Sequence, residues 1–147
     1  MIRRAATLSL FALVAACHRG PENPKVTEAW VRLPAVAGQP AAAYFTMHGA
    51  RTDERLVKIE STLAHVTQMH ETMSRGSGMA GMAPLASVEV PAGGAVRFEP
   101  AGRHAMLIGL DPVVTPGTAV PLRFGFADGK VAEAEAKTVA AGDDAPY

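Results

Sequence analysis

Short apolar segments, separated by Gly, Pro and Asp, recur along this chain from residue 26 to residue 139. Strands that pack one face on a core and end at turn residues give this pattern. It is clearest where Leu122, Phe124 and Phe126 alternate with other residues, and the following Asp128-Gly129 suits a tight hairpin turn because glycine tolerates a positive φ. The pattern predicts an all-β domain with about nine strands: Val26–Leu33, Ala41–Gly49, Arg55–Ser61, His65–Thr72, Ala86–Val90, Ala95–Glu99, His104–Leu110, Val120–Ala127 and Val131–Val139.

Strands at this spacing favour a β-sandwich with Greek-key connections, in which two sheets enclose one core. A chain of 147 residues suits a single core. Its hydrophobic fraction of 48% and charged fraction of 19% are those of a folded domain. The Ala-rich segment 131–141 would also suit a helix by intrinsic propensity. The formal net charge of zero argues against a nucleic-acid partner, which needs a basic face to neutralise phosphates.

The first 16 residues have the features of a secretory signal peptide. Arg3 and Arg4 precede a small apolar stretch, residues 5–16, that is too short to span a bilayer. The stretch ends in Val14-Ala15-Ala16-Cys17, which resembles the lipobox of bacterial lipoproteins, a signal whose cysteine is lipidated after cleavage. Cys17 is the only cysteine, so it has no partner for an internal disulfide. The simpler alternative is a cleaved signal that leaves an unmodified cysteine.

These features predict a protein of the cell envelope or periplasm that is anchored to a membrane through lipidated Cys17. Residues 17–24 would form the lipidated tether, because the segment after the cysteine holds two prolines and no apolar residue. Residues 25–141 would then form the β-sandwich domain and residues 142–147 a C-terminal tail. We expect a monomer.

The methionines indicate a binding site. Five of the seven lie between residues 69 and 106, and three of these flank a Gly/Ser-rich segment, residues 74–78: Met73, Met79 and Met82. Methionine usually fills cores, which fits Met47 and Met69. A Gly/Ser-rich loop is a poor place to bury a core side chain, so core packing does not account for Met79 and Met82.

Two histidines lie near that segment in the sequence. His104 and Met106 are two residues apart in an apolar strand, so their side chains share one face, about 7 Å apart at the backbone. His70 ends another expected strand just before the Met-rich segment. Strand ends and loops gather at one end of a sandwich, where binding sites commonly form. His70, Met82, His104 and Met106 are therefore candidate ligands of one metal ion.

The types of these ligands select the metal. Thioether sulfur is soft and uncharged, and it favours copper(I) over zinc, calcium or magnesium. A blue-copper site needs a cysteine ligand, and the only cysteine is residue 17. Only the two histidines compete for protons, so the affinity for copper(I) should fall below about pH 6.

Each histidine taken alone has a simpler interpretation, because most histidines are surface or core residues that bind nothing. We interpret His18, His48 and His65 in this way. The combination of two histidines and two methionines around a Met-rich segment, behind an export signal, is what favours a metal site. Met73 and Met79 are either spare ligands or an apolar shield for the ion.

The candidate ligands resemble the signature of the periplasmic copper chaperones written PCu(A)C, which is a His, ten residues, a Met, twenty-one residues, and then His-x-Met. Here 21 residues separate Met82 from His104, and His104-Ala105-Met106 completes the signature. Eleven residues rather than ten separate His70 from Met82, which leaves Met79 as an alternative ligand. The resemblance covers residues 27–139 and includes the flanking segments His70-Glu71, 90–94, 102–110 and 120–122.

The resemblance implies a cupredoxin-like Greek-key β-sandwich that carries one exposed copper(I) ion. It also implies that the protein delivers copper to a copper-accepting protein of respiratory oxidase assembly, often at the CuA centre. Some members have a His/Met-rich C-terminal tail for copper(II). Residues 141–147 contain neither His nor Met, so we expect no such second site.

A copper carrier, which is not an enzyme, is the leading hypothesis, and two others stay open. One is a copper-dependent redox or electron-transfer protein. The sequence shows no obvious set of acid/base residues around the candidate ligands, because the nearest charged neighbours, Glu71 and Arg103, are more simply interpreted as solvated surface residues. The other is a metal-free adhesion or scaffold sandwich of the envelope. It predicts that replacing His70 and His104 changes nothing except stability.

Overall fold

The computed structural model describes residues 20–75 and 79–147, and these residues form ten β-strands and no helix. The described part therefore contains no helix that could span a membrane. The predicted signal peptide, Cys17 and His18 lie outside the described residues. The strands are β1 (Lys25–Arg32), β2 (Ala41–His48), β3 (Glu54–Glu60), β4 (Ala64–Arg75), β5 (Met79–Pro84), β6 (Val88–Val90), β7 (Ala95–Phe98), β8 (Arg103–Leu110), β9 (Ala119–Phe126) and β10 (Val131–Val139).

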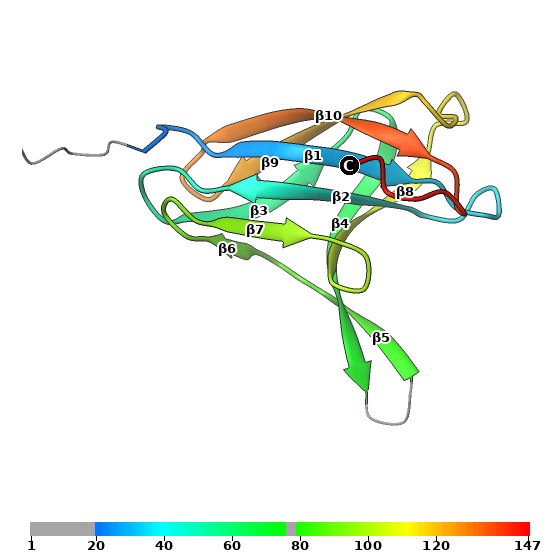
Figure 1. The fold of residues 1–147 in the computed structure, drawn as a ribbon, viewed down its shortest axis with the longest axis horizontal. Helices are drawn as coiled ribbons and strands as arrows, with labels where there is room; N and C mark the ends of the chain where they lie inside the picture. Colours follow the sequence, from blue (N-terminus) through cyan, green and yellow to red (C-terminus); the bar gives the residue numbers. More distant parts are fainter. Residues whose placement is uncertain (1–19, 76–78) are drawn as a thin grey trace, which may run out of the picture.

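The strands pair along one continuous path, β5-β4-β8-β2-β1-β10-β9-β3-β6, and β7 pairs with β2 beside this path. β2 and β3 are consecutive in the chain but lie far apart on the path, so their connection crosses between layers (Figure 1). The sheet curls around its core: Phe45 of β2 contacts Phe124 of β9 at 4.8 Å between ring centroids, although β1 and β10 separate the two strands on the path. One curled sheet thus provides both layers of the expected sandwich.

Alternation along the strands builds the core. In β9, Val120, Leu122, Phe124 and Phe126 are all buried, and the residues between them are more exposed. The Ala-rich segment forms strand β10 rather than a helix, because pairing with β9 on one side and β1 on the other overrides its intrinsic propensity. Met47 and Met69 are buried in the core, as the sequence predicted.

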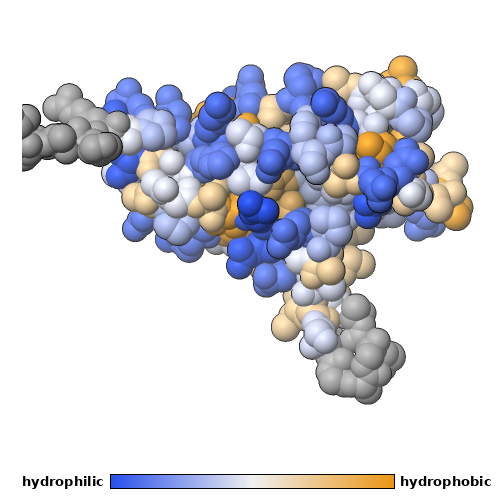
Figure 2. Space-filling model, in the orientation of Figure 1, coloured by the Kyte–Doolittle hydropathy of each residue, from blue (hydrophilic) through white to orange (hydrophobic). Residues whose placement is uncertain are grey.

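The segment expected to be a Met-rich loop forms strand at residues 73–75 and 79–82, which corrects the sequence-based prediction. β4 continues to Arg75, and its second half pairs with β5 from His70–Pro84 to Arg75–Met79. This β4–β5 arm, residues 70–75 and 79–84, projects from the body (Figure 1), and the coloured part of its surface is mostly pale and tan (Figure 2). Gly, Pro and Ala are depleted in strands, so the sequence did not predict β5, which forms by pairing with β4.

Candidate metal centre

The two candidate histidines are direct neighbours in the sheet. His70 of β4 pairs with His104 of β8 in an antiparallel register, so both side chains lie on one face of the ladder. Their rings are 6.0 Å apart between centroids and inclined by only 23°. The core face carries the residues of opposite parity, such as Met69, Ala105 and Leu107, so the histidine pair is on the outer face of the sheet.

One nitrogen of His104 is fixed by the backbone. His104 Nδ1 lies 3.1 Å from the carbonyl oxygen of Gly102. A carbonyl oxygen can only accept a hydrogen bond, so Nδ1 carries the proton and donates it. Nε2 of the neutral ring then keeps its lone pair, which is the form that binds a metal ion. No sequence pattern indicated this role of Gly102, because the bond depends on the local turn of the backbone before β8.

The ring of His70 is held differently. Its Nδ1 is buried and has no hydrogen-bond partner among the described residues. A buried polar atom without a partner costs about 1–3 kcal/mol. A ligand atom or ion that contacts this nitrogen would remove that cost, so His70 fits a metal ligand better than a structural residue.

The candidate methionines lie on either side of the histidine pair, on the strands that flank it. Met106 follows His104 by two residues on β8 and pairs with Gln68. Met82 pairs with Thr72, which follows His70 by two residues on β4. Alternation therefore places Met82, His70, His104 and Met106 on the same face of three adjacent strands, β5, β4 and β8. The side chain of Met82 is exposed, with a relative accessibility of 59%.

The register also separates the two candidate methionines of the arm. Met82 is opposite Thr72, about 7 Å along the strand from His70. Met79 is opposite Arg75, at the far end of the arm and about 16 Å along the strand from His70. The backbone of the arm therefore favours Met82 over Met79 as the candidate ligand.

The backbone positions of the four candidate ligands are spread along the strands. Met82 and Met106 lie two residues beyond the histidine pair in opposite directions, a separation of about 13 Å along the strands. Simultaneous contact with one ion therefore requires both methionine side chains to extend along the strands toward the histidine pair. The expectation that the site lies among loops at one end of the sandwich was wrong, because the candidate ligands lie in strands at the base of an arm.

The charged neighbours of the site do not face the histidines. Glu71 and Arg103 pair with each other across β4 and β8, and Arg103 Nε lies 3.3 Å from Glu71 Oε1. Both residues have the opposite parity to His70 and His104, so they lie on the other face of the ladder. The other two histidines of the body are not among the candidate ligands. His48 Nε2 lies 2.8 Å from the hydroxyl oxygen of Thr27, and His65 is exposed at the surface.

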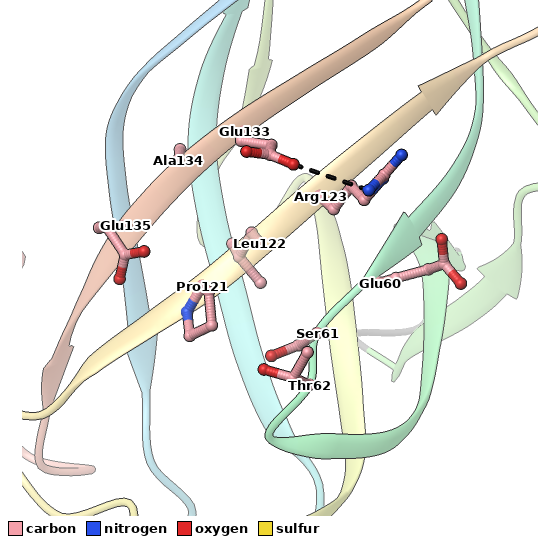
Figure 3. A pocket seen from close by; sticks show the side chains of 9 residues that line it. All are labelled: Glu60, Ser61, Thr62, Pro121, Leu122, Arg123, Glu133, Ala134 and Glu135. Atoms are coloured by element: carbon pink, nitrogen blue, oxygen red, sulfur yellow. Dashed lines mark ion pairs between the residues drawn. The ribbon is translucent and has the colours of Figure 1, made fainter. Parts of the chain in front are cut away.

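A separate hollow of about 410 Å³ lies over β9 and β10, far from the histidine pair along the pairing path (Figure 3). Three glutamates line it, and one of them, Glu133, pairs with Arg123 at 3.8 Å. None of the four candidate ligands lines this hollow. It is therefore not part of the candidate metal centre.

Comparison with known proteins defines the family. Residues 25–138 match the model of the family described as "Putative lipoprotein LpqE-like". The chain belongs to the LpqE-like family. One relative of similar sequence is "Putative lipoprotein Lxx21020" from Leifsonia xyli subsp. xyli, which is 27% identical over 108 residues, or 74% of this chain. The matched region spans 64% of the length of that relative.

Solved structures of PCuAC domains share the fold of this LpqE-like protein. The copper-bound PCuAC domain from PmoF2 has a TM-score of 0.63 and 19% identity, and the match covers 78% of this chain and 91% of that one. The solution structure of CuI-DR1885 from Deinococcus radiodurans has a TM-score of 0.61 and 26% identity, and the match covers 84% and 82% of the two chains. The expected cupredoxin-like all-β fold and the resemblance to the PCu(A)C family are confirmed.

Proposed function

We propose that this LpqE-like protein is a copper(I) chaperone that binds one copper(I) ion through His70, Met82, His104 and Met106 and passes it to an acceptor protein. The observation that carries the proposal is the direct pairing of His70 with His104 on the outer face, with one methionine on each side of the pair. Two imidazoles and two thioethers are soft, neutral ligands, which copper(I) prefers. The similar chain DR1885 has a solution structure described as its CuI form, which supports the same cargo.

The candidate ligands differ in exposure, and this suits transfer. His104 is 7% exposed and its Nδ1 is held by Gly102, whereas Met82 is 59% exposed at the base of the arm. In our proposal His104 holds the ion while Met82, on the more exposed strand, is the first ligand that an acceptor replaces. Thioether ligands carry no charge, so the exchange of one for another leaves no unpaired charge on the protein.

The acceptor and the location form the finer part of the proposal. We propose that lipidated Cys17 anchors the protein to a membrane of the cell envelope, with residues 17–24 as the tether, and the family description as a lipoprotein supports this. The acceptor we propose is a protein of respiratory oxidase assembly that receives copper for a CuA centre. Metabolic labelling with a palmitate analogue, compared between the parent and Cys17→Ser, tests the anchor. Label in both proteins would contradict it.

A copper(I) titration against a competing chelator tests the metal site. We expect one equivalent of copper(I) in the parent protein. His104→Ala and Met82→Leu should each lower the affinity by about tenfold or more, because each removes one ligand. Leucine keeps the volume and apolar character of methionine, so the variant separates ligation from packing.

Met79→Leu is the matched control, because it makes the same chemical change in the same strand, three residues away. It should keep the parent affinity. A loss of affinity in Met79→Leu with none in Met82→Leu would move the ligand to Met79. A parent protein that binds no copper(I) in the presence of a weak chelator would refute the chaperone function.

A further inference from the structure

The strands β3 and β4 leave an open gap in the sheet. β4 pairs with β8 along 64–71 and with β5 along 70–75, and β3 pairs with β6 along 54–56 and with β9 along 56–60. Among the described residues, none forms a backbone ladder with the outer edge of β3 at 57–60 or of β4 at 65–68. These two free edges face each other, and we call them the β3–β4 seam.

The backbone groups of β4 can be oriented from its neighbours. The amide of Leu85 donates to the carbonyl of Met69 at 2.8 Å, on the side of β4 away from β8. The amide of Thr72 donates to the carbonyl of Gly102 at 3.1 Å, on the β8 side. Successive residues of a strand direct their N–H and C=O groups to opposite edges. Thr67, two residues before Met69, therefore presents its N–H and C=O to the seam.

The seam contains hollows whose walls are part polar and part apolar. One hollow of about 490 Å³ is lined by residues of β3 and β4 and ends at His70. A second, of about 270 Å³, continues along the seam past Val66. Val57 and Val66, one on each strand, are 40% and 47% exposed. Unpaired backbone groups between exposed valines are the features that an added β-strand satisfies, by its own backbone and by alternate apolar side chains.

The β4 side of the seam lacks the protection that other edges of the sheet have, whereas the β3 side carries the charged residues Lys58 and Glu60. β6 and β7 are only three and four residues long, and the free strand β5 carries Pro84, all of which discourage strand addition. The seam stretch of β4, residues 64–68, reads Ala-His-Val-Thr-Gln and has no proline, lysine or acidic residue. An edge without such protection is a ready template for another extended chain.

We propose that the β3–β4 seam binds an extended segment of the metal-accepting protein as an added strand on β4, an inference that rests on the proposed chaperone function. The hollow of the seam ends at His70, so a segment bound there brings its own ligands beside the copper(I) site. The segment we expect is extended, has β-branched or other apolar residues at alternate positions, and pairs with Thr67 through its backbone.

The probe for this proposal is a blocked peptide of alternating threonine and valine, added to the 15N-labelled protein. We expect chemical-shift changes at residues 57–60 and 65–68. Hydrogen exchange of the Thr67 amide should slow by about tenfold or more at saturation, because this N–H gains a backbone acceptor. Shift changes confined to another edge or to the β4–β5 arm, or no change at millimolar peptide, would overturn the proposal.

Lysine substitution at exposed valines provides the matched comparison. Val66→Lys and Val57→Lys should weaken peptide binding by about tenfold or more, since a charge at an edge opposes strand addition. Val131→Lys, at a valine of β10 that is 39% exposed, should leave peptide binding unchanged. Equal binding by all three variants would contradict the seam.

The copper(I) titration of the same variants separates this inference from the function. Val66→Lys should bind copper(I) like the parent, because Val66 is not a candidate ligand. Copper(I) binding without peptide binding would refute the seam and leave the chaperone function standing. Peptide binding without copper(I) binding would refute the function, and with it the assignment of the segment to a metal acceptor.

Discussion

At the scale of single residues, the two histidines of the candidate site should differ in their effect on folding. His70 buries an Nδ1 atom without a partner, whereas His104 Nδ1 donates to Gly102. We therefore expect His70→Leu to stabilise the copper-free protein by about 1 kcal/mol, because an unsatisfied buried polar atom is removed. His104→Leu should destabilise it by a similar amount, since it removes the hydrogen bond from Nδ1 to the Gly102 carbonyl, which then keeps only the bond from the Thr72 amide.

Urea unfolding of the copper-free proteins measures both effects, and copper(I) titration should show weakened binding in both variants. A destabilisation by His70→Leu that equals or exceeds that of His104→Leu would indicate a structural role for His70. The buried Nδ1 of His70 would then no longer support a metal ion at this site.

Gly109 shows how one backbone position constrains β8. Its φ is +65°, and a Cβ added there would lie 2.8 Å from Nδ1 of His65. Gly109→Ala should therefore destabilise the protein by about 1–2 kcal/mol, from the left-handed backbone and the close contact together. Gly142→Ala is the control, because a Cβ there meets nothing within 4 Å. Thermal unfolding compares the two, and equal melting temperatures would contradict the expectation.

Part of the candidate site could be predicted residue by residue. The shared face of His104 and Met106 follows from their spacing alone, because alternation is a local property of a strand. The pairing of His70 with His104 could not be predicted in this way, since it depends on the register between strands that 33 intervening residues separate. The choice between Met79 and Met82 needed the same non-local register.

At the scale of elements, nine of the ten strands could be placed from apolar alternation and turn residues, with boundaries within a few residues of those observed. β5 was missed because its sequence, Met-Ala-Gly-Met-Ala-Pro, has neither alternation nor strand propensity. Its extended form depends on the partner strand β4 rather than on its own residues. The functional consequence is large, because Met82 lies on a strand with a fixed register and not on a free loop.

The β4–β5 arm should respond to copper(I) as a unit. β5 pairs only with β4 among the described residues, and in the proposed site the Met82 side chain shares one ion with the histidine pair and Met106. We expect fast hydrogen exchange of the β5 amides in the copper-free protein, because few contacts protect them, and slowing by about tenfold or more with copper(I).

Zinc(II) is the control for this exchange experiment, because zinc gains little from thioether ligands. It should leave the β5 amides unchanged even where it contacts the histidines. If both metals slowed the exchange of the β5 amides equally, or if copper(I) did not slow it, Met82 would not be a copper(I) ligand.

At the scale of the whole molecule, an ion network ties distant segments together and should make stability depend on pH. Lys130 Nζ lies 2.5 Å from Glu54 Oε1 at the start of β3 and 2.7 Å from Asp128 Oδ2 in the β9–β10 turn. The hydrogen bond from the Lys130 side chain holds the pKa of Asp128 below its ordinary value of 3.8. Hydrogen bonds to Asp128 and then to Glu54 raise the pKa of Lys130 above 10.5.

The sign of the effect follows from the direction of each shift. The contribution of Asp128 is fully present above its unfolded pKa of 3.8 and is lost as the pH falls through the lower folded value. The contribution of Lys130 is present below 10.5 and is lost as the pH rises through its higher folded value. We expect Asp128→Asn to reduce the loss of stability below pH 3.8 in urea unfolding. Asp144→Asn, in the exposed tail, should show the same loss of stability at low pH as the parent. If the unfolding free energy of the two variants had the same pH dependence, the ion network would be excluded as the source of the acid sensitivity.

The pairing of the first strand with the last has a consequence for how the protein is made. β1 lies between β2 and β10, and its pairing with β10 is parallel, so the middle of the sheet needs both ends of the domain. While residue 139 is still inside the ribosome, the nascent polypeptide cannot complete the pairing of β10 with β1. The three strands that bear the histidines and methionines attach to the rest through β2 and β1. The sheet that supports the histidine pair is therefore incomplete until β10 has left the ribosome.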